Sequence, residues 1–267
     1  MTREPDSGSR SLEWDGYAST WLDETPQRRW RMHSDALNSQ LCRRWLPRGR
    51  TDLIVKTDLF DEAVSDGIYT TLLDHADRVA AVDVSPVVAT AAVTRHSTML
   101  AATADVRLLP LRDDCADAVV SLSTLDHFTG PDDVTVALLE LTRILRPGGV
   151  LILTMDNPSN PVLAVRNSLP FSLTHKAGLV PYPVGRTYDV RTMCRMTEEA
   201  GLDVTHVTAI MHAPRMLAIQ ALRLVDGDRL DTHSRLAGTL MAFEKLESLP
   251  TRFVTGHFIA IRATKPF

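Results

Sequence analysis

The sequence predicts an α/β fold with a mainly parallel sheet that helices cover on both faces. Short apolar runs of strand length recur along the chain and alternate with segments of helical periodicity. A helix-start signal, Ser85 followed by Pro86, comes directly after one of these runs. Strands that alternate with helices form parallel sheets, because each helix carries the chain back to the start of the next strand.

The first fifty residues are expected to form an N-terminal helical cap ahead of an α/β domain at 51–267. Apolar residues within 27–46 recur at helical spacing, and Pro47 and Gly49 end that helix. Four aromatic residues of this region are either a cover over a site or anchors to the core: Trp14, Tyr17, Trp21 and Trp30.

Beyond residue 50 the elements follow in regular order. Strands are expected at 52–55, 78–84, within 104–111, and at 117–125, 150–156, 202–211 and 256–264. Helices are expected at 67–76, 85–96, 131–145 and 189–201, with two more within 214–248. The RPGG sequence at 146–149 predicts a turn. The last two strands lack a simple βαβ crossover, so one of them is expected to be antiparallel.

Residues 158–188 break this rhythm. Prolines recur through the segment, and its periodicity is weak. Connections of this length are unusual in compact domains and often form lids or binding loops. We therefore expect a substrate lid after the fifth strand.

Composition argues against several classes of partner. The 267 residues are 44% hydrophobic, which is enough for one large core. A net charge of -4 does not favour nucleic acid or an anionic membrane surface as the main partner. Cys42, Cys115 and Cys194 lie far apart without the spacing of a zinc site, so we expect no metal and a reducing cytoplasm. No apolar stretch reaches the roughly 18 residues of a membrane span.

Acidic residues follow two of the expected strands, where ligands of open parallel sheets bind. Asp83 closes the second strand, and a carboxylate there can accept hydrogen bonds from both hydroxyls of a ribose. Its alternative role is to stabilise the N-terminus of the next helix. Asp105, before an apolar LLPL, suits the amino group of a purine, or it is a surface turn residue.

Three motifs carry a family resemblance: VAAVDVS, ADVRLLPLRDDCADAVVSLSTLDHF and ELTRILRPGGVLILT. Over residues 51–157 the chain resembles the class I S-adenosylmethionine-dependent methyltransferases. The resemblance implies a Rossmann-like seven-stranded sheet with an antiparallel last strand. It also implies S-adenosyl-L-methionine as cofactor and S-adenosyl-L-homocysteine as product. Asp83 would then hold the ribose and Asp105 the adenine amino group. The other contacts expected beside them are Val84, Val106, Ser121, Ser123 and Thr124.

The stretch KTDLFDEAVSDG departs from the family pattern. The family usually has an acid and a glycine-rich loop after strand one, where the lack of Cβ atoms lets the backbone pass close to the cofactor. Here Lys56 stands near the acidic position, and Gly67 is the single glycine. Either a rebuilt loop offers Asp58 or Glu62 to the cofactor ammonium, or the loop is solvated and the site is lost. Acids suit a sulfonium and an ammonium but would repel a pyrophosphate, which argues against a dinucleotide.

Candidate catalytic residues follow the fourth strand. His127, next to Asp126, is a candidate general base, or it caps the loop that leads to the helix at Pro131. Candidate substrate contacts lie in and near the lid, where asparagine side chains alternatively form Asx turns: Asn157, Arg166, Tyr182 and Tyr188.

The leading hypothesis is methyl transfer to a small-molecule acceptor, on O, N or C. Two alternatives stay open. One is an enzyme that uses the same cofactor for cyclisation or aminocarboxypropyl transfer, and the other is a degenerate fold that serves as a binding module.

Overall fold

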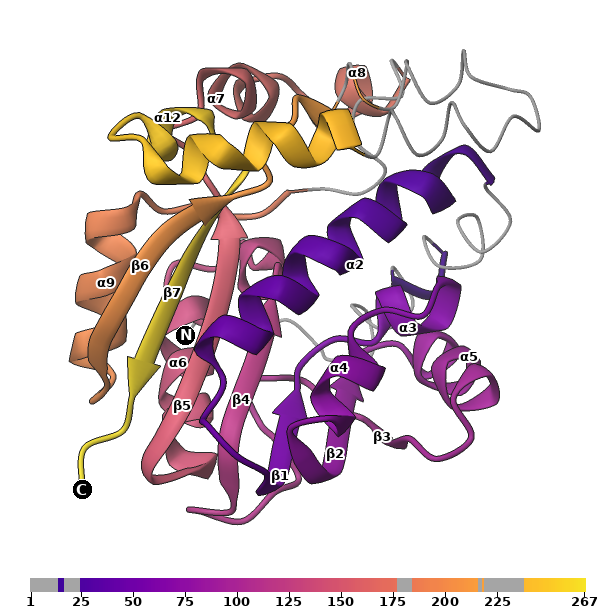
Figure 1. Ribbon diagram of the computed structural model, residues 1–267, viewed down its shortest axis with the longest axis vertical. Helices are drawn as coiled ribbons and strands as arrows, with labels where there is room; N and C mark the ends of the chain where they lie inside the picture. Colours follow the sequence, from indigo (N-terminus) through magenta and orange to yellow (C-terminus); the bar gives the residue numbers. More distant parts are fainter. Residues whose placement is uncertain (1–13, 17–24, 177–183, 216–217, 219–237) are drawn as a thin grey trace, which may run out of the picture.

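A central seven-stranded sheet organises the computed structural model, which describes residues 14–16, 25–176, 184–215, 218 and 238–267 (Figure 1). The strand order is β3-β2-β1-β4-β5-β7-β6. The strands are Thr51–Lys56 (β1), Ala76–Asp83 (β2), Leu100–Thr103 (β3), Ala116–Leu122 (β4), Leu145–Asp156 (β5), Asp203–Ile210 (β6) and Phe258–Thr264 (β7).

Helices connect and cover these strands. The α-helices of the described chain include Thr25–Trp45 (α2), Phe60–Val64 (α3), Tyr69–Leu73 (α4), Pro86–Arg95 (α5), Asp133–Ile144 (α6), Pro161–Ser168 (α7), Phe171–Lys176 (α8), Val190–Glu199 (α9) and Arg252–Thr255 (α12). Two 3-10 turns are Leu125–His127 (η1) and Glu244–Ser248 (η2).

The sheet is mainly parallel, with β7 as its antiparallel strand. β1 pairs in parallel with β2 and β4, β2 with β3, and β4 with β5. β7 lies between β5 and β6 and runs antiparallel to both. The expected Rossmann-like sheet with an antiparallel last strand is therefore confirmed.

Alternate residues of the central strands enter two separate cores. Ile54 of β1 faces a core that includes residues of α2, α4 and α5, whereas its neighbour Val55 faces the core under α6 and α9. The same alternation holds for Ile152 and Leu153 of β5. Because successive side chains of a strand point to opposite faces, a continuous apolar run is what a sheet with two covered faces requires.

The helix α2 packs against two different parts of the molecule along its length. Its C-terminal half contributes Leu41, Cys42 and Trp45 to the core on one face of the sheet. Its N-terminal half runs on toward α3 (Figure 1), where Trp30 and Leu37 join a small cluster with Met211. The first half thus lies near the carboxyl ends of the strands.

Three expectations about local structure were wrong. The third strand was expected within 104–111 but is formed by Leu100–Thr103. This strand, LAAT, is short and lies at the edge of the sheet, where its side chains are largely exposed, whereas Leu109 of the apolar LLPL is buried outside any strand. The expected turn at 146–149 is a bulge within β5, where the register with β4 shifts and Gly148 has a φ of 78°.

The third difference is the helix α3, which forms inside the acidic stretch after β1 where a loop was expected. The expected lid also contains helices, α7 and α8. Most of the region expected to hold two helices, 214–248, lies outside the described residues.

Candidate functional site

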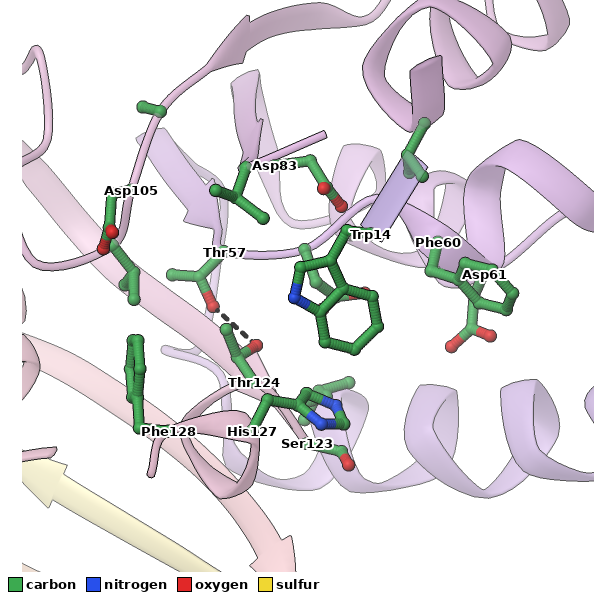
Figure 2. A pocket seen from close by; sticks show the side chains of 16 residues that line it. Trp14, Thr57, Phe60, Asp61, Asp83, Asp105, Ser123, Thr124, His127 and Phe128 are labelled. Carbon is green, nitrogen blue, oxygen red and sulfur yellow. Dashed lines mark hydrogen bonds between the residues drawn. The ribbon is translucent and has the colours of Figure 1, made fainter. Parts of the chain in front are cut away.

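A cavity of about 180 Å³ opens at the carboxyl ends of β1, β2 and β4 (Figure 2). It lies where an open parallel sheet places its ligands. Its walls come from the N-terminal segment, the acidic stretch and the strand ends: Trp14, Thr57, Asp58, Phe60, Asp61, Asp83, Val84, Val88, Ala104, Asp105, Val106, Leu122, Ser123, Thr124, His127 and Phe128.

Asp83 ends β2 on the wall of this cavity. Its Oδ1 accepts a hydrogen bond from the Ser85 N–H at 2.8 Å, and its Oδ2 accepts one from the Leu59 N–H at 2.9 Å. Burial raises the pKa of Asp83 to about 6, although both backbone bonds favour the charged form. The carboxylate is therefore held in one orientation, as a fixed acceptor for a ligand hydroxyl must be.

Asp105 follows β3 and also lines the cavity. The guanidinium of Arg107 forms an ion pair with it at 2.5 Å and a second ion pair with Asp133 at 2.7 Å. The same guanidinium lies 5.2 Å from the centre of the Phe128 ring. Sequence reasoning missed Arg107, because its position two residues after Asp105 looked like part of a turn.

The loop after β1 is built around a buried lysine. Lys56 is only 2% exposed, and its Nζ lies 2.8 Å from Glu62 and 3.1 Å from Asp58. Burial lowers the pKa of Lys56, but the negative charges of Asp58 and Glu62 outweigh this effect and raise it overall. Lys56 itself does not line the cavity, so its positive charge does not face a ligand there.

Glu62 and Gly67 complete the loop rather than the cavity wall. Glu62 is fully buried, and its Oε1 accepts a hydrogen bond from the Ile68 N–H at 3.0 Å. Gly67 has a φ of 55°, and a Cβ there would lie 2.4 Å from the same Glu62 oxygen. Glycine is needed here because any side chain would displace the Glu62 carboxylate.

Two acids of this stretch do reach the cavity, Asp58 and Asp61. Sequence reasoning put Asp58 or Glu62 first and missed Asp61 as the second acid. Burial raises the pKa of Asp61 to about 8, with smaller contributions from the negative charges of Asp35 and Asp58. The sequence alone could not show this difference, because it depends on the orientation of the helix α3. In that helix Asp61 faces the cavity, whereas the next residue, Glu62, faces the core.

Hydroxyl groups connect the ends of β1 and β4. The Thr57 Oγ1 donates to the Ser121 Oγ at 2.9 Å and lies 3.0 Å from the Thr124 Oγ1 (Figure 2). Ser123 and Thr124 line the cavity, whereas Ser121 is fully buried behind it. Ser123 has a φ of 51°, a left-handed conformation that bends the chain sharply as it leaves β4.

His127 lines the cavity, but its neighbour Asp126 does not. The Nε2 of His127 is 3.9 Å from the Asp126 Oδ1, which is too long for a hydrogen bond. Asp126 instead accepts bonds from the Ser123 Oγ at 2.9 Å and the Asp156 N–H at 3.0 Å, and burial raises its pKa. The pair is thus not a hydrogen-bonded dyad in this structure, and Asp126 fixes the loop that carries His127.

Two contacts fix the position of His127 and of the turn that carries it. The indole of Trp14 meets the His127 ring edge-on, with centroids 4.8 Å apart (Figure 2). The C-terminal end of the expected lid pairs with η1 and the next residue: the N–H groups of Gly185 and Arg186 donate to the carbonyls of Asp126 and Phe128, both at 2.7 Å. A Cβ on Gly185 would lie 2.3 Å from the Phe128 carbonyl oxygen.

The three candidate substrate residues that the structure describes do not line this cavity. Asn157 is buried and donates to the carbonyls of Phe253 and Gly256 at 2.7 and 2.9 Å, which makes it a structural link between two loops. Arg166 is ion-paired with Asp156. Tyr188 packs against the core under α6 and α9. Tyr182 lies outside the described residues.

A second cavity, of about 100 Å³, adjoins the first. Both cavities share four lining residues: Phe60, Asp61, Leu122 and Ser123. The remaining walls come from α2, the end of β5 and the segments around β6 and β7: Trp30, Arg31, Ser34, Asn38, Thr154, Met211, Arg215 and Phe258. Arg31 and Asn38 come from α2, whereas Arg215 comes from the segment after β6, far along the chain.

The described part of the chain shows neither a metal-binding cluster nor a membrane-spanning helix. In the part of the chain that the structure describes, no three His, Cys, Asp or Glu side chains are grouped so that they could hold a metal ion. Among the same residues, no helix combines the length and hydropathy needed to cross a bilayer.

Solved structures of similar fold span nearly the whole chain. A chain from the complex between the Haloferax volcanii Trm112 methyltransferase activator and a candidate methyltransferase is 19% identical, with a TM-score of 0.59 and coverage of 96% of this chain and 97% of that one. The [4+2]-cyclase SpnF is 15% identical, with a TM-score of 0.60 and coverage of 100% and 98%.

The geranyl diphosphate C-methyltransferase of Streptomyces coelicolor, solved with Mg²⁺, geranyl diphosphate and S-adenosyl-L-homocysteine, is 14% identical. Its TM-score is 0.55, with coverage of 87% of this chain and 77% of that one. A search of curated proteins by sequence finds no match. Residues 60–153 match the family described as "Methyltransferase domain". The chain therefore has the fold of solved class I methyltransferases, and its residues 60–153 match the sequence model of a methyltransferase domain.

Proposed function

We propose that the protein transfers a methyl group from S-adenosyl-L-methionine to a small-molecule acceptor, on O, N or C. The observation that carries this proposal is the composition of the first cavity. It combines two carboxylates at the ends of β2 and β3, apolar side chains between them and two further acids on the β1 side. A nucleoside bearing positive charge is the ligand that such a wall suits.

The lining residues fit the cofactor part by part. Asp83 would accept bonds from the ribose hydroxyls, and Val84 and Val106 would contact the adenine. Asp105 would accept from the adenine amino group while Arg107 holds it in place. Asp58 and Asp61 would face the ammonium group of the cofactor. The sequence had suggested either Asp58 or Glu62 for this role. The cofactor supplies an electrophilic methyl group on its sulfonium.

The chain must then position the acceptor and, where needed, remove a proton. His127 is the titratable side chain of η1 on the cavity wall, next to Ser123 and Thr124. We propose it as the general base, with Asp126 as a positioning residue that acts through the loop. His127→Ala should lower turnover about 100-fold or more while the affinity for S-adenosyl-L-homocysteine stays unchanged. Unaltered turnover would remove His127 from this role.

A second candidate function keeps the cofactor but not the methyl transfer. It is favoured by the acidic stretch, which replaces the family's glycine-rich loop beside the methionine part of the cofactor. In this function the cofactor is cyclised or its aminocarboxypropyl group is transferred. The similarity in fold to SpnF, a cyclase, gives a further reason to identify the products directly.

Calorimetry with S-adenosyl-L-homocysteine tests both functions against a non-catalytic binding module. We expect binding and a raised melting temperature. No heat and no thermal shift at millimolar ligand would reject both enzymatic functions. If the ligand binds, mass spectrometry after incubation with S-adenosyl-L-methionine separates methyl transfer from cyclisation or cleavage.

We also propose a reducing compartment, the cytoplasm, as the place of action. All three cysteines are free thiols, and Cys42 and Cys115 are buried where no partner thiol can reach them.

A further inference from the structure

The N-terminal half of α2 presents polar side chains to the interior. Trp30, Ser34 and Asn38 recur every four residues, so they lie on one face of the helix, and Arg31 lies beside them. Arg31 and Asn38 are both buried and line the second cavity. Arg31 thus brings a guanidinium group to the wall of the second cavity, beside the polar side chains of Ser34 and Asn38.

Positive charge dominates the lining of the second cavity. Arg31 reaches it from α2 and Arg215 from the segment after β6, whereas Asp61 is the acid among its described lining residues. The guanidinium of Arg31 lies 5.4 Å from the centre of the Phe60 ring, and Phe60 lines both cavities. Asp61 lies on the wall that the two cavities share, where it would face the ammonium of the cofactor, so the two arginines are the cationic groups left for an acceptor.

The rest of the lining is apolar, with a few hydrogen-bonding groups. Trp30, Leu122, Met211 and Phe258 provide apolar contact area. Ser34, Asn38 and Thr154 provide hydroxyl and amide groups. A site of this kind suits a molecule with a compact apolar body and one anionic group, because guanidinium groups bind carboxylates and phosphates in bidentate geometry.

We propose that the second cavity binds the methyl acceptor, and that this acceptor carries a carboxylate or phosphate group held by Arg31 and Arg215. The proposal rests on the proposed function, because it places the acceptor next to the cofactor cavity through the shared residues Asp61 and Ser123. The apolar body of the acceptor would then contact Trp30 and Phe258.

Calorimetry with three small benzene derivatives, two anionic and one neutral, tests whether the second cavity prefers an anionic ligand. The protein, saturated with S-adenosyl-L-homocysteine, is titrated with phenyl phosphate, benzoate and benzyl alcohol at constant ionic strength. We expect at least one anion to bind about ten-fold or more tightly than the alcohol, and the preferred anion identifies the group as phosphate or carboxylate. Equal affinities for all three probes would overturn the proposal.

Charge-removing variants then test the two arginines. Arg31→Gln and Arg215→Gln should each weaken anion binding about ten-fold and leave benzyl alcohol binding unchanged. Arg195→Gln on α9 is the matched control, because Arg195 is 66% exposed and distant in the fold from the strand ends. Arg215 is only partly buried, so its variant remains informative if Arg31→Gln is too unstable to purify.

The cofactor titration keeps the two proposals apart. If S-adenosyl-L-homocysteine does not bind the wild-type protein, the proposed function fails. If it binds and the arginine variants retain wild-type affinity for the anions, the proposed function stands and this inference fails. If the arginine variants lose affinity for S-adenosyl-L-homocysteine but not for the anions, the arginines hold the cofactor carboxylate, and the inference is again overturned.

Discussion

The neighbouring strands β1 and β2 end on the same rim of the sheet, but their terminal charged residues serve different purposes. β2 ends in Asp83, a carboxylate on the cavity wall that two backbone N–H groups hold in place. β1 ends in Lys56, a cation that is buried among acids and does not line the cavity. The charge at the end of β2 is available to a ligand, whereas the charge at the end of β1 is used to build the loop.

This difference explains how the chain can lack a glycine-rich loop and keep a cavity. A glycine loop allows a close approach through the absence of side chains. Here the ion pair of Lys56 with Glu62 supports a short helix, and that helix presents Asp58 and Asp61 to the cavity. The Leu59 N–H also donates to Asp83, so the rebuilt loop and the end of β2 are joined directly.

Removing the cation of β1 should have the largest effect. Lys56→Met leaves the fully buried Glu62, and the partly exposed Asp58 beside it, without their counter-ion, so we expect the free energy of unfolding to fall by about 3–5 kcal/mol. Chemical denaturation monitored by circular dichroism measures this change. The double variant Lys56→Met, Glu62→Leu should recover most of the loss, because it removes the uncompensated charge as well. A single variant as stable as the wild type would show that the ion pair does not support the loop.

Asp83→Asn tests the charge at the end of β2. The asparagine keeps the shape but loses the negative charge, and charge-assisted hydrogen bonds contribute about 1.5–3 kcal/mol. We therefore expect the affinity for S-adenosyl-L-homocysteine to fall about 10- to 100-fold in calorimetry. Adenine, which has no ribose, is the control ligand and should bind the variant and the wild type alike. An unchanged affinity for S-adenosyl-L-homocysteine would refute the ribose assignment.

Asp61→Asn tests whether the rebuilt loop faces the ligand. With a pKa of about 8, Asp61 is mostly neutral in the free protein at pH 7. An ammonium placed beside it favours the carboxylate, so binding should release a proton and become tighter as the pH rises from 6 to 8. Asp61→Asn should abolish the part of this pH dependence near pH 8 and weaken binding at pH 8.5 about five-fold, on the order of 1 kcal/mol.

Two controls accompany the Asp61 measurement. Asp66→Asn, on an 88% exposed side chain of the same stretch, should behave like the wild type. Methylthioadenosine, which lacks the amino acid part, should keep only the pH dependence near pH 6 that Asp83 contributes and should lose the part near pH 8. A pH dependence near pH 8 that persists in Asp61→Asn would assign the titration to another group.

Trp14→Ala should have the smallest effect. The turn that carries Trp14 is joined to the end of β2, because Asp15 accepts a hydrogen bond from the Ser85 Oγ. Aromatic contacts contribute about 0.5–1.5 kcal/mol, so losing the indole should weaken ligand binding about two- to ten-fold and accelerate dissociation in stopped-flow fluorescence. Tighter binding in the variant would show instead that the indole competes with the ligand for the cavity.

The sequence predicted the fold well because the central strands are continuous apolar runs and the helix starts are marked by residues such as Ser85 and Pro86. It failed at β3, because the four-residue edge strand LAAT is short and the neighbouring LLPL is also apolar. The site was predictable where a residue ends a strand, as at Asp83. It was not predictable where the orientation of a short helix decides, as for Asp61 and Glu62, or where residues far apart in the chain meet, as for Arg31 and Arg215.

The pairing of Gly185 and Arg186 with the carbonyls of Asp126 and Phe128 has a mechanical consequence. Two hydrogen bonds at 2.7 Å join the C-terminal end of the expected lid to the turn that carries His127, and the close approach at Gly185 leaves little room for one to move without the other. A displacement of residues 184–186 would therefore shift the imidazole with it. Displacement of these residues and misalignment of the proposed base would then be a single event, and amide exchange at Gly185 and Arg186 would report how often it occurs.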